Sequence, residues 1–219
     1  MSSETAPDRH PVIWPADINP ETGSRVGIPR REDLDAEGQA VFDATLASAN
    51  APYRGGIPGG GLTGPAGIQL HSPLYRKNFQ SMNDYLRFGS GISPRIREIA
   101  ILSTARETDH QYEWCGHEPM ALRVGVEPEL INIIRYRQSL DTVNDGDAII
   151  IALVREVIGG KRVTPETYAR ASALLGTQML VNLCGLVGHY MSVGVLLRVF
   201  DRQLKDGWTP SLPDLDGQV

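Results

Sequence analysis

The chain has 219 residues, the usual size of one domain whose core needs neither disulfides nor a structural metal. Hydrophobic residues make up 41% and charged residues 21%, which excludes disordered and fibrous proteins. The formal net charge of −5 offers no basic surface for nucleic acid. Aromatic residues are only 6%, so the core must be mostly aliphatic, which favours packed helices. The composition therefore predicts a soluble, all-α protein.

The cysteines and the apolar segments limit the compartment. Cys115 and Cys184 fall in separate predicted helices, so they form no disulfide framework, CxxC redox motif or zinc set. The first residues lack the apolar core and cleavage signature of a signal peptide. The longest apolar run, residues 180–197, is interrupted by polar residues and glycines and is too polar for a membrane span. We expect a cytoplasmic protein that needs no membrane.

The N-terminal third divides into an arm, a helix and a loop. Residues 1–32 are rich in Pro, Asp, Arg and Gly, which predicts an irregular arm that lies along the body, embraces a neighbouring subunit or stays loose. A helix is expected over residues 33–49. Residues 50–71 are the densest Gly and Pro segment, predicted as a non-helical wall on the substrate side. His71 closes this loop.

The rest of the chain reads as a series of helices. Proline in a first turn, Ser or Thr before it, and glycine at the end are the signals used for the boundaries. No segment shows the two-residue alternation of a strand, so no sheet is expected. One domain should span residues 33–204, with a tail over residues 205–219. Helices are predicted at residues 72–88, 94–106, 110–124, 126–138, 144–158, 164–176 and 177–204.

Chemistry concentrates in residues 94–119, which read as a helix, a tight break and a second helix. The spacing of His110, Glu113 and His117 places them on one face of the second helix. Glu98 lies on the preceding helix, off its buried stripe but next to apolar neighbours. Thr108 in the break is predicted to form a capping box with Gln111. Two imidazoles and two carboxylates near each other suit general acid/base catalysis.

Two patterns in this segment carry a resemblance to a known family. They are R-E-x-A-I-L at residues 97–102 and Y-E-W-x-x-H-x-P-x-A at residues 112–121. Both resemble the carboxymuconolactone decarboxylase family, which shares its fold with the alkylhydroperoxidases. The peroxidase pattern of that fold is Glu, eleven residues, Cys-x-x-Cys, three residues and His. Its Glu and His fall on Glu98 and His117, whereas its cysteines fall on His110 and Glu113. The acid and the imidazole are present and both thiols are absent.

The resemblance implies an all-α alkylhydroperoxidase-like domain with a central antiparallel helix pair. It implies a lyase, without metal or cofactor, that transfers protons on a small carboxylated ring or enol-lactone. His117 would be the general acid/base and Glu98 part of a proton relay. From the spacing alone, either Glu113 on the same helix or Glu98 across the helix pair could hydrogen-bond the ring and orient it. His110 is expected to be neutral, because the positive end of its helix disfavours the imidazolium. Relatives form trimers or hexamers, so a homo-oligomer is expected.

Further residues are candidates for holding the substrate. His189 and Tyr190 lie where the family tends to have an aromatic pair on its last helix. Arg97, with Arg95 and Arg106 beside it, could clamp a substrate carboxylate. His71 and Trp114 complete the set, although a hydrogen-bonded structural role for His71 and a packing role for Trp114 are the simpler alternatives.

Three alternative functions remain open at this point. A thiol peroxidase needs two neighbouring thiols, and only Cys115, predicted to be buried and inert, is near. A metal enzyme could use His110, Glu113 and His117 as ligands, with His189 as a fourth. A non-enzymatic, oligomeric small-molecule binding protein would use the same crevice without chemistry.

Overall fold

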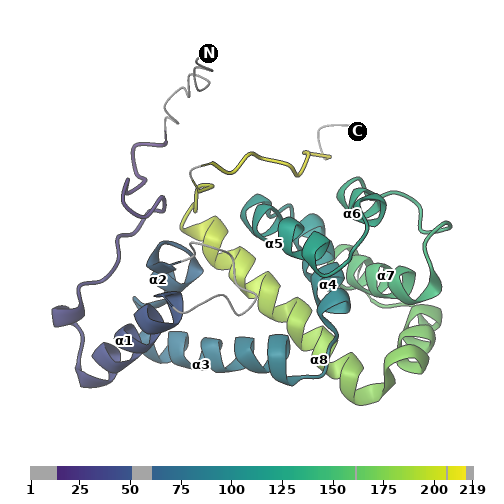
Figure 1. Cartoon of the computed structure of the whole chain (residues 1–219), viewed down its shortest axis with the longest axis horizontal. Helices are drawn as coiled ribbons and strands as arrows, with labels where there is room; N and C mark the ends of the chain where they lie inside the picture. Colours follow the sequence, from purple (N-terminus) through teal and green to yellow (C-terminus); the bar gives the residue numbers. More distant parts are fainter. Residues whose placement is uncertain (1–13, 51–60, 161, 206, 216–219) are drawn as a thin grey trace, which may run out of the picture.

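The computed structural model describes residues 14–50, 61–160, 162–205 and 207–215, and in these ranges the protein is all-helical (Figure 1). The extended contacts among the described residues are limited to one isolated bridge between Asn19 and Ser24. The fold class predicted from composition is therefore confirmed. The α-helices are α1 (Ala36–Asn50), α2 (Pro65–Gln69), α3 (Pro73–Asp84), α4 (Pro94–Glu107), α5 (Gln111–Arg123), α6 (Pro128–Arg135), α7 (Asp145–Gly159) and α8 (Pro165–Val199).

Most helix starts follow the sequence signals. Proline occupies the first turn of α2, α3, α4, α6 and α8, where its missing N–H costs nothing. The side chains of Ser93, Asn144 and Thr164 accept backbone hydrogen bonds and cap α4, α7 and α8. The segment predicted as one helix over residues 72–88 divides into α3 and a π-helical turn, Tyr85–Gly89. The helix predicted at residues 126–138 is shorter, Pro128–Arg135.

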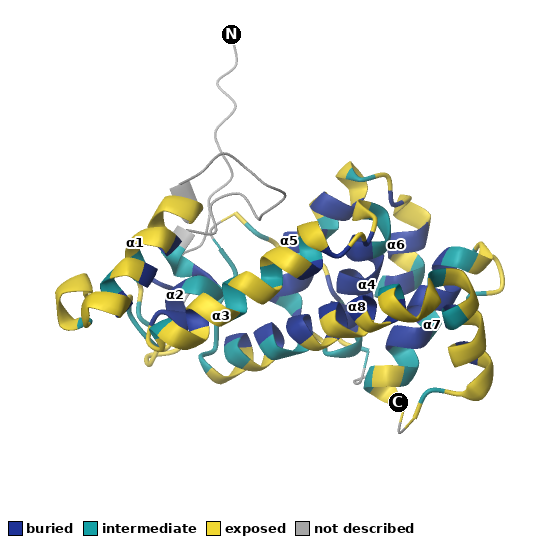
Figure 2. Cartoon of the chain, turned by 90° about the horizontal axis from the view of Figure 1, so that it is seen from below, coloured by how far each residue is buried: buried dark blue, intermediate teal, exposed yellow. Residues whose placement is uncertain are grey.

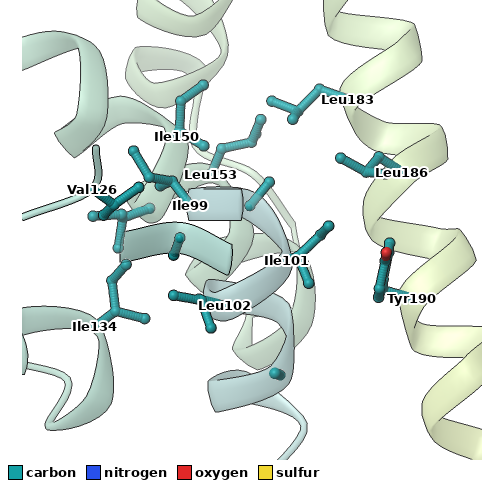
Figure 3. Close-up of a cluster of buried hydrophobic side chains, with 14 of the residues drawn as sticks. Ile99, Ile101, Leu102, Val126, Ile134, Ile150, Leu153, Leu183, Leu186 and Tyr190 are labelled. Atoms are coloured by element: carbon teal, nitrogen blue, oxygen red, sulfur yellow. The ribbon is translucent and has the colours of Figure 1, made fainter. Parts of the chain in front are cut away.

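Helix α4 lies at the centre of the molecule. It packs against α5, α6, α7 and α8, and every residue from Arg97 to Arg106 is buried (Figure 2). Figure 3 shows Ile99, Ile101 and Leu102 of α4 between side chains of α7 and α8. The sequence predicted only one buried stripe on this helix. A helix surrounded by four others buries its polar side chains as well, and those side chains must then find partners.

Helix α8 is the longest and joins the two ends of the molecule (Figure 1). Gly176 inside it has φ 70° and ψ 164°, so the predicted break between two helices is present as a kink. The helix ends at Val199, earlier than the predicted residue 204. By length and composition α8 could span a membrane, but 56% of its apolar window is buried inside the protein. A buried core helix has the same composition.

The Gly- and Pro-rich segment is partly helical. The prediction of a non-helical loop over residues 50–71 was wrong for α2, because Pro65 starts a short helix after Gly64. Gly67 is required in this helix, since an added Cβ would lie 1.6 Å from the Leu62 carbonyl oxygen. Residues 51–60 lie outside the described residues, so the predicted substrate-side wall is not placed.

The arm and the tail both lie against the helical body. The backbone N–H of Arg25 donates to the Phe200 carbonyl at 2.8 Å, and that of Gln203 donates to the Gly23 carbonyl at 2.8 Å. Residues 14–30 therefore follow the end of α8, as one of the alternatives for the arm expected, whereas residues 1–13 lie outside the described part. In the tail, Leu212 is buried and both its N–H and its carbonyl bond to Gln111.

Candidate acid/base site

The site is built on the hairpin of α4 and α5, which run antiparallel. The N–H of His110 donates to the Ala105 carbonyl at 2.7 Å at the closed end. At the open end Arg95 of α4 donates to the carbonyl of Gly125 just after α5. Midway between these contacts Glu98 faces His117, nineteen residues later in the chain. The helix-break-helix pattern is therefore what brings the two residues together.

The Nδ1 side of the His117 ring is fully bonded. His117 Nδ1 lies 2.7 Å from Glu98 Oε2, and Arg97 Nε donates to Glu98 Oε1 at 3.0 Å. Arg97 Nη1 also donates to the Arg87 carbonyl at 2.7 Å. Glu98 is 0% exposed and His117 2%. Burial by itself raises the pKa of the Glu98 carboxyl, but His117, Arg87 and Arg97 outweigh it and lower that pKa overall.

The state of Glu98 fixes the state of the imidazole. An ionised carboxylate only accepts hydrogen bonds, so Nδ1 of His117 must carry the proton that it donates to Glu98. In the neutral ring the lone pair is then on Nε2. This nitrogen points to the other carboxylate of the hairpin, with Glu113 Oε2 at 3.6 Å. That separation is too long for a hydrogen bond.

Glu113 is a buried carboxylate that receives no hydrogen bond from the described residues around it. It is 4% exposed, and we find no hydrogen bond to its carboxylate from any residue that the structure describes. Of the two carboxylates that could orient the His117 ring, Glu98 makes the hydrogen bond and Glu113 does not. Buried charges normally have hydrogen-bonded partners, and exceptions concentrate at functional sites.

Of the aromatic pair expected on the last helix, Tyr190 contacts the His117 ring, whereas His189 stacks on Phe79. The ring of Tyr190 meets the His117 ring edge-on, with centroids 5.1 Å apart, and burial raises the pKa of its hydroxyl. His189 stacks on Phe79 with centroids 4.0 Å apart. Burial and the nearby Arg87 lower the pKa of His189 to about 4, so this ring is neutral. Its buried Nε2 has no hydrogen-bond partner in the described part of the chain.

The turn between α4 and α5 differs from the prediction. Thr108 forms no capping box, because its hydroxyl donates to the Thr104 carbonyl within α4 at 2.7 Å. The residue before α5 is His110, which makes no side-chain cap. Gln111 instead bonds to the tail at Leu212. With Asp109 at φ 50°, the connection is too tight for Thr108 to reach the second helix.

His110 faces α8 rather than His117. Its Nε2 donates to the Gly194 carbonyl at 3.0 Å, so in the neutral ring Nδ1 is an acceptor, and this atom is buried without a partner. A Cβ on residue 194 would lie 3.0 Å from the ring, which explains the glycine. The pKa of His110 is lowered, in the predicted direction, but burial is the main cause rather than the helix dipole.

The geometry does not support the metal alternative. Within the described ranges no group of three or more His, Cys, Asp or Glu side chains is placed to hold a metal ion. His110 is bonded to Gly194, and His117 has one nitrogen committed to Glu98. The spacing in the sequence is therefore not matched by convergence of the side chains.

The predicted arginine clamps all have internal partners. Arg97 holds Glu98, as described above. Arg95 bonds to Asp147 and to Glu127, each at 2.6 Å. Arg106 donates to the Pro213 carbonyl at 2.7 Å and so fastens the tail. These contacts give the three side chains structural roles.

Three further candidates lie apart from the His117 ring. Trp114 is 0% exposed and donates through Nε1 to Glu118 Oε2 at 2.8 Å, which is the packing role. His71 is exposed and its Nε2 bonds to the Gly27 carbonyl at 2.8 Å, which is the structural role. Cys115 is half-buried rather than buried, its Sγ lies 3.4 Å from the Thr209 carbonyl, and burial raises its pKa. Its thiolate form is therefore disfavoured.

Sequence reasoning missed one cationic residue, Lys205. It follows α8 in a segment without periodic pattern, so only its rarity marks it, since the chain has three lysines, Lys77, Lys161 and Lys205. Its Nζ is buried.

Comparison with known proteins adds no assignment: no protein-family model matches this chain, and no curated protein matches it. The likeness to the carboxymuconolactone decarboxylases therefore depends on the motif residues alone.

Proposed function

We propose that the protein is a cofactor-free acid/base enzyme of the carboxymuconolactone decarboxylase type. The observation that carries this proposal is the buried hydrogen bond of 2.7 Å between His117 Nδ1 and Glu98. It fixes one nitrogen of the ring and leaves the other, Nε2, beside an unbonded carboxylate at 3.6 Å. A held imidazole with one available nitrogen is the arrangement that general acid/base catalysis requires.

The substrate in this proposal is a small carboxylated ring or enol-lactone. In a decarboxylation, the bond between the carboxylate carbon and its neighbour breaks and carbon dioxide leaves. The electron pair moves into a conjugated carbonyl and forms an enolate. Before this step Nε2 takes up a proton from solvent, and Glu98 stabilises the imidazolium that results. His117 then delivers this proton from Nε2 to the carbon and returns to the neutral ring. An isomerisation would use the same proton transfers without loss of carbon dioxide.

Glu113 has the second role in this scheme. Its carboxylate lies within 3.6 Å of Nε2 but makes no hydrogen bond to it. A substrate group placed against both atoms could exchange a proton with either of them. We assign Glu113 to proton exchange with the substrate, and Glu98 to holding and charging the ring.

Assembly into a trimer or hexamer is part of the same proposal. Several large apolar side chains on the outer faces of α3, its π-helical turn and α8 are exposed: Leu74, Met82, Tyr85, Phe88, Val181, Val195 and Val199. Exposed apolar side chains that adjoin one another mark contacts between proteins, and we place the subunit contacts at these residues. Light scattering that gives only the 23.9 kDa monomer at micromolar concentration would refute the assembly.

The activity itself is tested with a panel of carboxylated enol-lactones and β-oxo acids incubated in D₂O. The proposal predicts that at least one compound is converted, with one solvent deuterium at the carbon that is protonated. Peroxide reduction by added thiols is measured on the same preparation. Turnover of peroxide but of no carboxylate would favour the peroxidase and contradict the proposal.

A further inference from the structure

A second group of buried polar atoms lies beside the first. Lys205 Nζ is buried and has no hydrogen-bond partner within the described residues, and it lies 5.0 Å from the centre of the Trp208 ring. Tyr112, 2% exposed, has its own ring 5.2 Å from that of Trp208. The Tyr112 hydroxyl is likewise buried; Arg202 lies beside it as a donor, and its own hydrogen has no acceptor within the described residues. Trp208 thus connects an ammonium donor and a hydroxyl donor, neither of which has an acceptor.

This group adjoins the acid/base site. Tyr112 is the neighbour of Glu113 in the first turn of α5. The Glu113 carboxylate acts on the titration of both Tyr112 and Lys205, which places all three within electrostatic reach. Through Trp208, the segment after α8 therefore brings a cation to Tyr112, the residue before Glu113 in α5.

An unpaired buried ammonium indicates a missing anion. Burying a charge is costly unless it is paired, and natural proteins seldom leave such a group without a partner. Arg202 lies over the Tyr112 ring, with its guanidinium carbon 5.0 Å from the centroid, and adds positive charge nearby. The arginines predicted to hold a substrate carboxylate have internal partners, as shown above. Lys205 is the cation that the described contacts leave available.

We infer that Lys205 and Tyr112 bind the carboxylate of the substrate next to Glu113. The ammonium supplies the charge, the Tyr112 hydroxyl supplies a second donor, and Trp208 forms an apolar wall against the body of the ligand. This inference rests on the proposed function, because it names the substrate-binding residues of the same site. The ligand class is a small organic carboxylate whose apolar ring lies against Trp208.

The test measures binding apart from turnover, with benzoate as the probe in isothermal titration calorimetry. Lys205→Met should weaken benzoate binding by about 10- to 100-fold, the worth of one charge-assisted hydrogen bond. Tyr112→Phe should weaken it by less. The matched control is Lys77→Met, because Lys77 is exposed and pairs with Glu37 at 3.0 Å, and this variant should bind normally. His117→Ala should also bind benzoate, which separates a failure of this inference from a failure of the proposed chemistry.

A second readout does not depend on the variants folding. Reductive methylation with ¹³C labels the three lysines and the amino terminus, and the methyl resonances of Lys205 should shift when benzoate is added. Equal benzoate affinity of wild type and Lys205→Met would overturn the inference, as would a benzoate-insensitive Lys205 resonance. An imine between Lys205 and a β-oxo acid, trapped by reduction with borohydride, would also overturn it. The lysine would then be a nucleophile rather than a carboxylate binder.

Discussion

The two nitrogens of the His117 ring have opposite surroundings. On the Nδ1 side, Glu98 receives hydrogen bonds from both His117 and Arg97, and Arg97 in turn holds a backbone carbonyl. On the Nε2 side, Glu113 receives no hydrogen bond from a described residue, and the nearby donors of Tyr112 and Lys205 have no acceptor among the described residues. Both residues are nearly buried, Glu98 at 0% and Glu113 at 4% exposure.

Under the proposed function, the Nδ1 side of the His117 ring stabilises the protein and the Nε2 side takes part in the reaction. Satisfied buried networks make a structure rigid, whereas unsatisfied polar groups cost stability and persist where function requires them. The Nδ1 side should therefore matter for stability and for the orientation of the ring. The Nε2 side should matter for turnover and ligand binding, with little benefit for folding.

The largest effect is expected for His117→Ala, which removes the group shared by the two halves. Turnover should fall by about 10²- to 10⁴-fold, the usual contribution of a positioned acid/base. Steady-state kinetics on the accepted substrate measures it, with the melting temperature as the check on folding. Near-normal turnover of His117→Ala would contradict the acid/base role proposed for this ring.

The two carboxylates provide the sharpest test of the contrast. Glu98→Gln removes a buried charge paired with Arg97 and His117, so the free energy of unfolding should fall by about 3 kcal/mol. Glu113→Gln removes an unbonded buried charge, so stability should stay within about 0.5 kcal/mol or rise, while turnover falls. Urea denaturation of both variants compares them directly. Equal destabilisation would mean that Glu113 is bonded as well as Glu98.

Acid should destabilise the protein through His189. Its pKa is about 4 in the folded state against 6.5 for an unperturbed histidine, so the unfolded chain binds more protons between these pH values. The free energy of unfolding should therefore decrease as pH falls from 6.5 to 4, by up to about 3 kcal/mol from this residue. His189→Phe should remove that part of the loss, measured by urea denaturation at several pH values. An unchanged pH profile would place His189 in a solvated site.

The smallest effect is expected for Cys115→Ser. Cys115 lies against the tail at Thr209, and its raised pKa disfavours the thiolate. Activity should remain within about two-fold of wild type, since no step in the mechanism uses a thiol. A stable Cys115→Ser variant without activity would instead favour the peroxidase.

How far the sequence could predict the site depended on the kind of signal. Proline, glycine and cap residues predicted the order of the helices. The break at Gly176, present as a kink, was predicted because glycine adopts a positive φ without a steric clash. Glu98 and His117 were found from the motif. The partners of Arg97, the unbonded carboxylate of Glu113 and the buried Nζ of Lys205 were not, because they depend on which helices surround α4 and on where the segment after α8 returns. No local pattern encodes such tertiary contacts.

The most direct test of the central claim is the protonation of the His117 ring nitrogens, measured by ¹⁵N–¹H NMR at a pH where the ring is neutral. The account predicts that Nδ1 carries the proton and Nε2 the lone pair, with the Nδ1 signal lost or shifted in Glu98→Gln and retained in Glu113→Gln. A proton on Nε2, sensitive to Glu113 rather than to Glu98, would contradict the assignment of the holding and reactive sides.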